Sequence, residues 1–235
     1  MKSLLLFNFF LLLILSCNEK DTYMVAWWNF DKIENGLVKD LSGNGLHAIV
    51  NNAHFIDGKI GKAFHGDGTG YLEVKHKPLL DDFKDGITIT VWIYREKDSG
   101  SDYNCIITRE IRDTWSEYFD IAILKNKPLF AVDVDGAHYM QTNYPEELPL
   151  QQWIHLAGTF NNKKFRLYID GKEAASGKME MSYRFSDQNP LIIGSNTNDQ
   201  GREMHDHFLG RIDDLRVYNR ALSAEEIADI YRQMR

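Results

Sequence analysis

From Tyr23 onward the chain is a succession of short stretches whose composition is typical of β-strands. They are rich in β-branched and aromatic residues and are separated by turn-forming residues. We expect strands at residues 24–30, 45–50, 70–74, 87–94, 105–109, 118–124, 129–134, 153–160, 165–170, 190–195 and 211–218. Many short strands with few helices predict an all-β fold, a two-sheet antiparallel sandwich of the jelly-roll kind.

Local patterns add detail to this sandwich. In residues 87–94, isoleucine and valine alternate with threonine, tryptophan and tyrosine, so both faces of this strand should be covered. The pair Asp170-Gly171 predicts a type I′ hairpin, because both residue types accept a positive φ angle. We expect one short C-terminal helix, since Ser223 and Glu226 have the spacing of a capping box.

The start of the chain has the features of an export signal. Residues 4–15 are an apolar run that follows a lysine and is too short to span a bilayer comfortably. The run ends in "LILSC", which resembles a bacterial lipobox, in which the signal is cut just before a cysteine that becomes lipidated. We therefore expect a signal peptide over 1–16, a lipidated Cys17 with a tether over 17–22, and one domain over 23–235. The alternative is an ordinary secretory signal that happens to contain a cysteine.

Charge and cysteine content narrow the possible partners. The formal net charge of −7 disfavours nucleic acid, because neutralising phosphates requires clustered lysine and arginine. Cys105 is the only cysteine left for the domain, so no disulfide can form within it, and we expect this thiol to be buried.

Several stretches occur in the order found in one protein family. They are "WWNFD…DLSGNGLHA", "GKAFHGDGTGYLEV", "ITITVWIY", "WIHLAGTF…FRLYIDG", "LIIGS" and "FLGRIDDLRVYNRALSAEEI". Together they resemble the LamG-like jelly-roll domains of the concanavalin A-like superfamily over residues 23–235. The resemblance implies one concave and one convex antiparallel sheet, with the first and last strands adjacent.

Some relatives in that superfamily hydrolyse β-glucans with paired carboxylates on an E-x-D-x-E strand, and this pattern is absent here. Glu117 and Asp120 have odd spacing, which predicts that they lie on opposite faces of their strand. Asp133 and Asp135 could share a face, but Asp135 belongs to a turn. We therefore predict that the domain is not an enzyme.

Two adjacent carboxylates, Asp213 and Asp214, interrupt the last strand. Strict alternation places Asp213 on the apolar face, where a carboxylate requires hydrogen bonds or a cation. The resemblance brings this strand beside the N-terminal segment and implies a structural calcium on the sandwich flank. We expect calcium to be bound by Asp31, the carbonyl group of Gly45 and Asp213, with Asp214 as the ligand if a bulge shifts the register. The alternative is that Asp213 accepts hydrogen bonds from backbone amides.

Aromatic residues in polar loops are the candidates for binding a sugar, because the apolar faces of sugars stack on exposed rings. They are Trp115, Tyr139, Tyr144 and Tyr183, of which Trp115 is the strongest. The sequence thus predicts a non-catalytic carbohydrate-binding module held by a lipid anchor at the bacterial outer membrane or cell surface. Its partner would be a glycan or cell-surface polysaccharide, with envelope proteins as further partners. The alternatives are a protein-adhesion module without sugar affinity and a diverged glycoside hydrolase.

Overall fold

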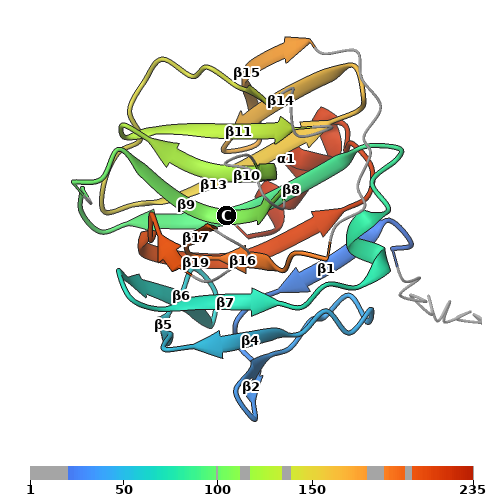
Figure 1. Ribbon diagram of the computed structural model, residues 1–235. Helices are drawn as coiled ribbons and strands as arrows, with labels where there is room; N and C mark the ends of the chain where they lie inside the picture. The colour runs from blue at the N-terminus through green and yellow to red at the C-terminus, as the bar shows by residue number, and fades with distance from the viewer. Residues whose placement is uncertain are drawn as a thin grey trace, which may run out of the picture.

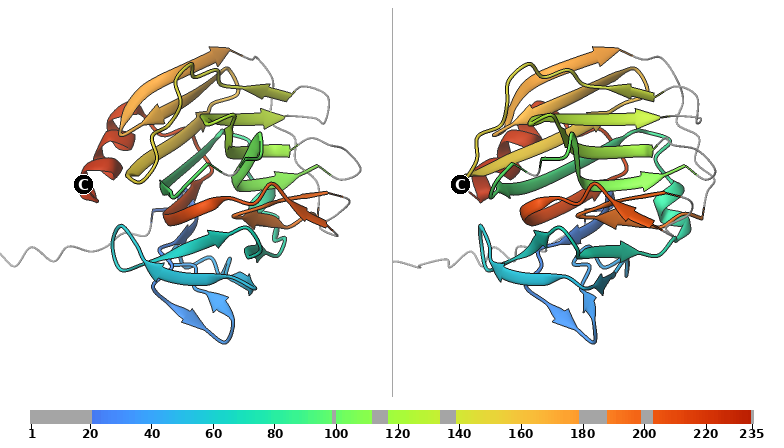
Figure 2. Two further views of the ribbon diagram at one scale, coloured as in Figure 1. Left: turned by 90° about the vertical axis from the view of Figure 1, so that its left-hand side faces the viewer. Right: turned by 60° about the vertical axis from the view of Figure 1, so that its left-hand side comes forward.

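The computed structural model describes residues 21–98, 100–111, 117–133, 139–178, 188–198 and 203–234. Within these ranges two large antiparallel sheets pack face to face (Figure 1, Figure 2). The predicted all-β sandwich with one short C-terminal helix is therefore confirmed.

The first sheet has eight strands among the described residues, in the order β15-β14-β13-β8-β19-β6-β5, and β1 pairs with β19 beside this path. The strands are β1 (Met24–Trp28), β5 (His54–Asp57), β6 (Lys62–Asp67), β8 (Ile87–Arg95), β13 (Trp153–Phe160), β14 (Lys164–Ile169), β15 (Lys172–Lys178) and β19 (Leu209–Tyr218). The antiparallel pairing of β1 with β19 confirms that the first and last strands are adjacent.

The second sheet has nine strands in the described part of the chain, in the order β12-β11-β10-β9-β16-β7-β4-β3-β2. They are β2 (Ile33–Glu34), β3 (Leu37–Val38), β4 (Ala48–Asn51), β7 (Tyr71–Val74), β9 (Tyr103–Glu110), β10 (Glu117–Leu124), β11 (Lys127–Asp133), β12 (Tyr139–Gln141) and β16 (Leu191–Ile193). A separate hairpin joins β17 (Asn196–Asn198) to β18 (Glu203–His205), and a short 3-10 helix, η1, spans Pro78–Asp81.

The core lies between the two sheets. As predicted, the isoleucine and valine side chains of β8 belong to this core, while Trp92 of the same strand lies on the outer face of the sheet, the face turned away from the other sheet. The Asp170-Gly171 hairpin is also confirmed, with φ angles of +49° and +76°. Cys105 is free and buried, as expected for a small apolar side chain.

One helix, α1 (Ala224–Gln233), covers part of the outer face of the first sheet (Figure 2). Its predicted capping box is present: the Ser223 hydroxyl accepts a hydrogen bond from the Glu226 amide, and the Glu226 carboxylate accepts one from the Ser223 amide. The Tyr231 ring stacks on Trp92 with 5.5 Å between ring centroids. Within the described ranges, no helix is both long and apolar enough to cross a membrane.

A bulge in β19 corrects one prediction from the sequence. Asp213 pairs with Trp92 and Arg216 pairs with Thr90, with a register shift between them, and Asp214 has a φ angle of +46°. The extra residue breaks the two-residue alternation, so Ile212 and Leu215 both point into the core. The prediction that Asp213 shares the apolar face of Leu215 was therefore wrong, and Asp213 points to the opposite side.

Candidate functional site

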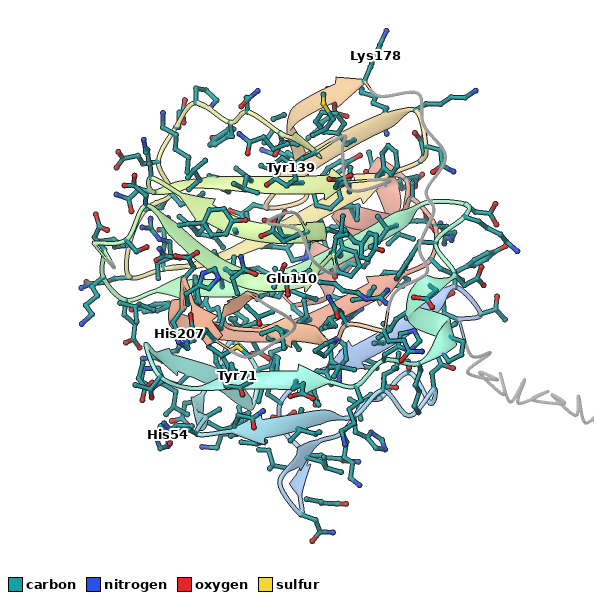
Figure 3. All side chains as sticks on the ribbon, viewed as in Figure 1. His54, Tyr71, Glu110, Tyr139, Lys178 and His207 are labelled. Carbon is teal, nitrogen blue, oxygen red and sulfur yellow. The ribbon has the colours of Figure 1, made fainter. Side chains whose placement is uncertain are left out.

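A pocket of about 550 Å³ lies on the outer face of the second sheet, where β9, β10 and β12 meet the β17–β18 hairpin. Among the described residues, its walls consist of Tyr103, Glu110, Glu117, Tyr139, Asn196, Thr197, His205 and Asp206. Glu110 and Tyr139 are labelled over this sheet in Figure 3. Volumes between about 300 and 1,000 Å³ are typical of sites for small ligands.

A second bulge brings acidic side chains together in this pocket. Glu117 of β10 pairs with Glu110 of β9, and the register shifts before Phe119, which points into the core. Glu117 and Asp120 therefore lie on the same face of β10, and the prediction that odd spacing separates them was wrong. The residue inserted at the bulge reverses the alternation on which that prediction depended.

Hydrogen bonds hold these carboxylates in place. The Asn196 side-chain amide donates to Glu117 at 2.9 Å, and the Tyr103 hydroxyl donates to Oδ2 of Asp120. His205 Nδ1 and an Asp206 carboxylate oxygen are 2.7 Å apart. The other oxygen of Asp120, Oδ1, is buried and has no hydrogen-bond partner among the described residues.

Burial dominates the electrostatics of the pocket. It raises the pKa of Asp120 well above the usual range of a carboxyl group, and the adjacent negative charge of Glu117 raises it further. Burial is also the main cause that raises the pKa of Glu117, although its bond to Asn196 acts in the opposite direction. Burial also raises the pKa of the Tyr103 hydroxyl, so this group stays a hydrogen-bond donor at neutral pH.

A second pocket of about 300 Å³ lies on the same outer face. It includes Leu124 of β10, Leu129 of β11 and Gln141 of β12, together with Tyr144. A small apolar cluster links the two pockets. Tyr103, which lines the first pocket, and Leu124, which lines the second, pack against the same buried residues, among them Leu129.

The four aromatic residues predicted to bind a sugar lie in different parts of the chain. Tyr139 lines the first pocket and Tyr144 the second, while Trp115 and Tyr183 lie outside the described residues. In the sequence, Trp115 lies between Glu110 and Glu117, which are both wall residues of the first pocket. Sequence reasoning missed the acidic wall of the pocket, because only the strand pairing brings its members together.

The structure assigns other partners to two of the predicted calcium ligands. The Gly45 carbonyl oxygen accepts a hydrogen bond from the Lys77 ammonium group at 2.6 Å. Asp214 accepts one from the Trp27 indole at 2.7 Å and forms an ion pair with Arg216 at 2.9 Å. The Gly45 carbonyl group and the Asp214 carboxylate therefore have different hydrogen-bond partners, and none of these bonds joins the two groups.

Asp31 and Asp213 both bind the turn over residues 58–62. One Asp213 oxygen accepts hydrogen bonds from the amides of Lys59 and Ile60 at 2.8 and 3.1 Å, and the other accepts from the Asp214 amide at 2.7 Å. Asp31 accepts from the Lys62 amide at 2.7 Å. Burial raises the pKa of Asp213 to about 7, against the effect of the three amides.

These bonds explain how a carboxylate is accommodated on the last strand, and they match the alternative in which Asp213 caps backbone amides. Within the described ranges, no group of three or more histidine, cysteine, aspartate or glutamate residues is arranged to hold a metal. The calcium ion stays a prediction.

Two antiparallel sheets packed face to face in this strand order define a jelly-roll sandwich of the concanavalin A-like kind. The chain belongs to the concanavalin A-like lectin/glucanases superfamily, whose family model matches residues 66–228. A search of curated proteins found no match.

Solved structures share the fold at low sequence identity. Domain 4 of AbnA, an extracellular arabinanase from Geobacillus stearothermophilus solved with arabinotriose, is 20% identical with a TM-score of 0.68, and the match covers 89% of this chain and 98% of that domain. The binding domain of botulinum neurotoxin DC with SialylT is 16% identical, with a TM-score of 0.67 and coverage of 92% and 52%. The same toxin domain with rat synaptotagmin II is 15% identical, with a TM-score of 0.68 and coverage of 92% and 53%. The chain thus spans about half the length of these toxin binding domains.

Proposed function

We propose that this domain is a non-catalytic carbohydrate-binding module that binds glycan on the outer face of the second sheet. The observation that carries the proposal is the pocket of about 550 Å³, which combines two tyrosines with closely spaced carboxylate and amide groups. Apolar rings with a few oriented polar groups are typical of small-molecule sites.

The chemistry of the walls suits a sugar. Carboxylate oxygens of Glu110 and Glu117 accept hydrogen bonds from sugar hydroxyls, and the Tyr139 ring offers a face for stacking. Tyr139 is 36% exposed, so a ligand can reach it. The second pocket, with Tyr144, would take a further unit of the same polysaccharide.

The structural relatives support a binding module, because they include a domain solved with arabinotriose and one solved with SialylT. One relative was solved with a protein receptor, which supports the alternative of a protein-adhesion module. The pocket favours the glycan, since its tyrosines and hydrogen-bonding groups converge on one ligand-sized volume.

A glycan array followed by calorimetry tests this function. Tyr139→Ala should weaken binding of the selected glycan by about 1–3 kcal/mol, by analogy with the stacking of bases on aromatic rings. The melting temperature should change little, because Tyr139 is partly exposed. Trp115→Ala should have the same effect if its loop contributes to the site.

Tyr23→Ala is the matched control, because Tyr23 is 49% exposed and does not line the pocket. An array without any bound glycan would instead favour protein adhesion. A strong drop in melting temperature with unchanged affinity would show that Tyr139 is structural.

Glycoside hydrolysis is a second candidate, because Glu110 and Glu117 lie side by side on paired strands. The raised pKa of Glu117 is a property of general acids in such enzymes. We expect no release of reducing sugar from β-glucans by the pure protein. Release that disappears in Glu117→Gln would replace the binding module with an enzyme.

We also propose that acyl chains on Cys17 hold the module at the bacterial envelope, where it would capture polysaccharide near the cell. The motif "LILSC" supports this location. A structural calcium ion shared by Asp31 and Asp213 remains part of the proposal, supported by their common attachment to the turn at 58–62.

A further inference from the structure

Carboxylates dominate the charged groups of the first pocket. Glu110, Glu117 and Asp206 line it, and no lysine or arginine lies among its described wall residues. His205 is the one imidazole in this part of the wall, and it is already bonded to Asp206 at 2.7 Å. The described wall therefore carries more negative than positive charge.

A fourth carboxylate lies on the pocket face of β10. Asp120 is fully buried, and its Oδ2 accepts a hydrogen bond from Tyr103, which lines the pocket. Its Oδ1 has no hydrogen-bond partner among the described residues. Asp120 is not among the described wall residues and also interacts with the Ala131 amide, so it contacts the pocket through Tyr103.

We propose that this pocket recognises the protonated amine of an amino sugar within a glycan. The inference rests on the proposed glycan-binding function and names the class of sugar. An ammonium group brings three hydrogen-bond donors and one positive charge, and the carboxylates of the wall supply acceptors of opposite charge. The sugar ring would lie against Tyr139 while its amine is directed towards Glu117 and Glu110.

The same charges disfavour other ligands. A uronic acid or sialic acid would bring a carboxylate close to Glu110, Glu117 and Asp206, where like charges repel. Burial raises the pKa of Glu117 and Asp120, although the nearby His205 opposes the rise for Glu117. In the described part of the chain, no group of three or more histidine, cysteine, aspartate or glutamate residues is arranged to hold a metal ion at this pocket.

Calorimetry with three tetrasaccharides that differ only at C2 tests the proposal. The β-1,4-linked glucosamine tetramer should bind at least about tenfold more tightly than its N-acetylated counterpart and than cellotetraose. Its affinity should fall as salt is raised, because part of the attraction is between opposite charges.

The variant Glu117→Gln tests the charge of this side chain, because glutamine has nearly the same shape as glutamate but is neutral. The glutamine retains an oxygen for the hydrogen bond from Asn196, so the local geometry should persist. Affinity for the glucosamine tetramer should fall about tenfold, and affinity for cellotetraose should change less than about threefold. The matched control is Glu34→Gln, because Glu34 lies on β2 at the opposite edge of the same sheet and its loss should alter neither affinity.

The outcomes distinguish failure of the amino-sugar inference from failure of the proposed glycan-binding function. Equal or tighter binding of cellotetraose or the acetylated tetramer, reduced by Tyr139→Ala, would overturn the amino sugar and keep the glycan module. Absence of binding to every tetramer and to the glycan array would overturn both. Binding of a trilysine peptide without binding of the glucosamine tetramer would assign the pocket to a protein cation instead.

Discussion

At the scale of residues, two inserted positions decide which side chains meet. Asp214 at the bulge of β19 turns Asp213 away from the core, and the bulge after Glu117 in β10 puts Glu117 and Asp120 on one face. Because side chains alternate with a period of two, one extra residue moves a carboxylate to the other side of a sheet. Both acidic sites of this molecule depend on such an insertion.

His155 should make stability depend on pH. It is buried against Trp92 and Tyr231, and burial lowers its pKa from 6.5 to about 3. The folded state therefore binds fewer protons than the unfolded state between pH 3 and 6.5, so stability is lost as the pH falls through this window. We expect the free energy of unfolding to drop by about 2 kcal/mol from pH 7 to pH 5 because of this residue.

Urea unfolding at the two pH values measures this effect. His155→Phe retains an aromatic ring between Trp92 and Tyr231 but cannot be protonated, so its stability should fall less between pH 7 and pH 5. The same pH dependence in parent and variant would show that another group is responsible.

Asp213 should stabilise the fold whether or not calcium is bound. Asp213→Ala leaves three backbone amides without their acceptor, and we expect a loss of about 2–4 kcal/mol in urea unfolding with a chelator present. If calcium is also bound, the chelator alone should lower the melting temperature of the parent, and elemental analysis should find the metal. A variant as stable as the parent would contradict the role of Asp213 as a hydrogen-bonded strut.

At the scale of elements, α1 is held at its first turn and along one face. The capping box closes its N-terminus, and Arg220 forms an ion pair with Glu226 at the same turn. This interaction lowers the pKa of Glu226 to about 2, so its stabilising effect is present above pH 4.5 and is lost as the pH falls towards 2.

Ser223→Ala should cost about 1 kcal/mol in the free energy of unfolding, because the Glu226 amide loses its acceptor. Thermal unfolding followed by circular dichroism at pH 7 gives the magnitude. Ser223→Asp, which keeps a capping oxygen, should stay close to the parent. Equal losses in both variants would show that the serine acts through something other than the cap.

At the scale of the whole molecule, the two outer faces differ in kind. The helix α1 packs on the first sheet (Figure 2), whereas the second sheet presents the pocket, whose wall residues Glu110 and Tyr139 are labelled in Figure 3. A ligand held on the second sheet would thus meet a wall of strands and hairpins, with no contact to α1.

Lipidation should hold the whole molecule at a membrane. In a bacterial host, the parent chain should incorporate labelled fatty acid and partition with membranes, because acyl chains on Cys17 would supply the proposed anchor. Cys17→Ala should abolish the label, and Cys105→Ala is the control, since that buried thiol lies within the domain. Identical labelling of parent and Cys17→Ala would show that the signal is an ordinary secretory one.

Local patterns in the sequence were sufficient for most of the fold. Each of the longer predicted strands is present, because residue composition and alternation act within a single strand. The hairpin at Asp170 and the cap at Ser223 depend on neighbours two or three residues away, and both are confirmed. The strands β2, β3, β12, β17 and β18 have only two or three residues, too few to show a period, and were missed. The longer strands β5, β6 and β15 were missed as well, because together they contain few β-branched and aromatic residues.

Tertiary structure alone decided the site. Glu117 meets Glu110 through strand pairing and Asn196 through a hydrogen bond across 79 residues of sequence, and no local pattern encodes either contact. The bulges were hidden as well, since an inserted residue is recognised only against the partner strand that it fails to match. The sequence by itself thus determined which segments become strands and where the chain turns. The packing of distant strands determined which carboxylates share a face, because register and bulges depend on the whole sheet.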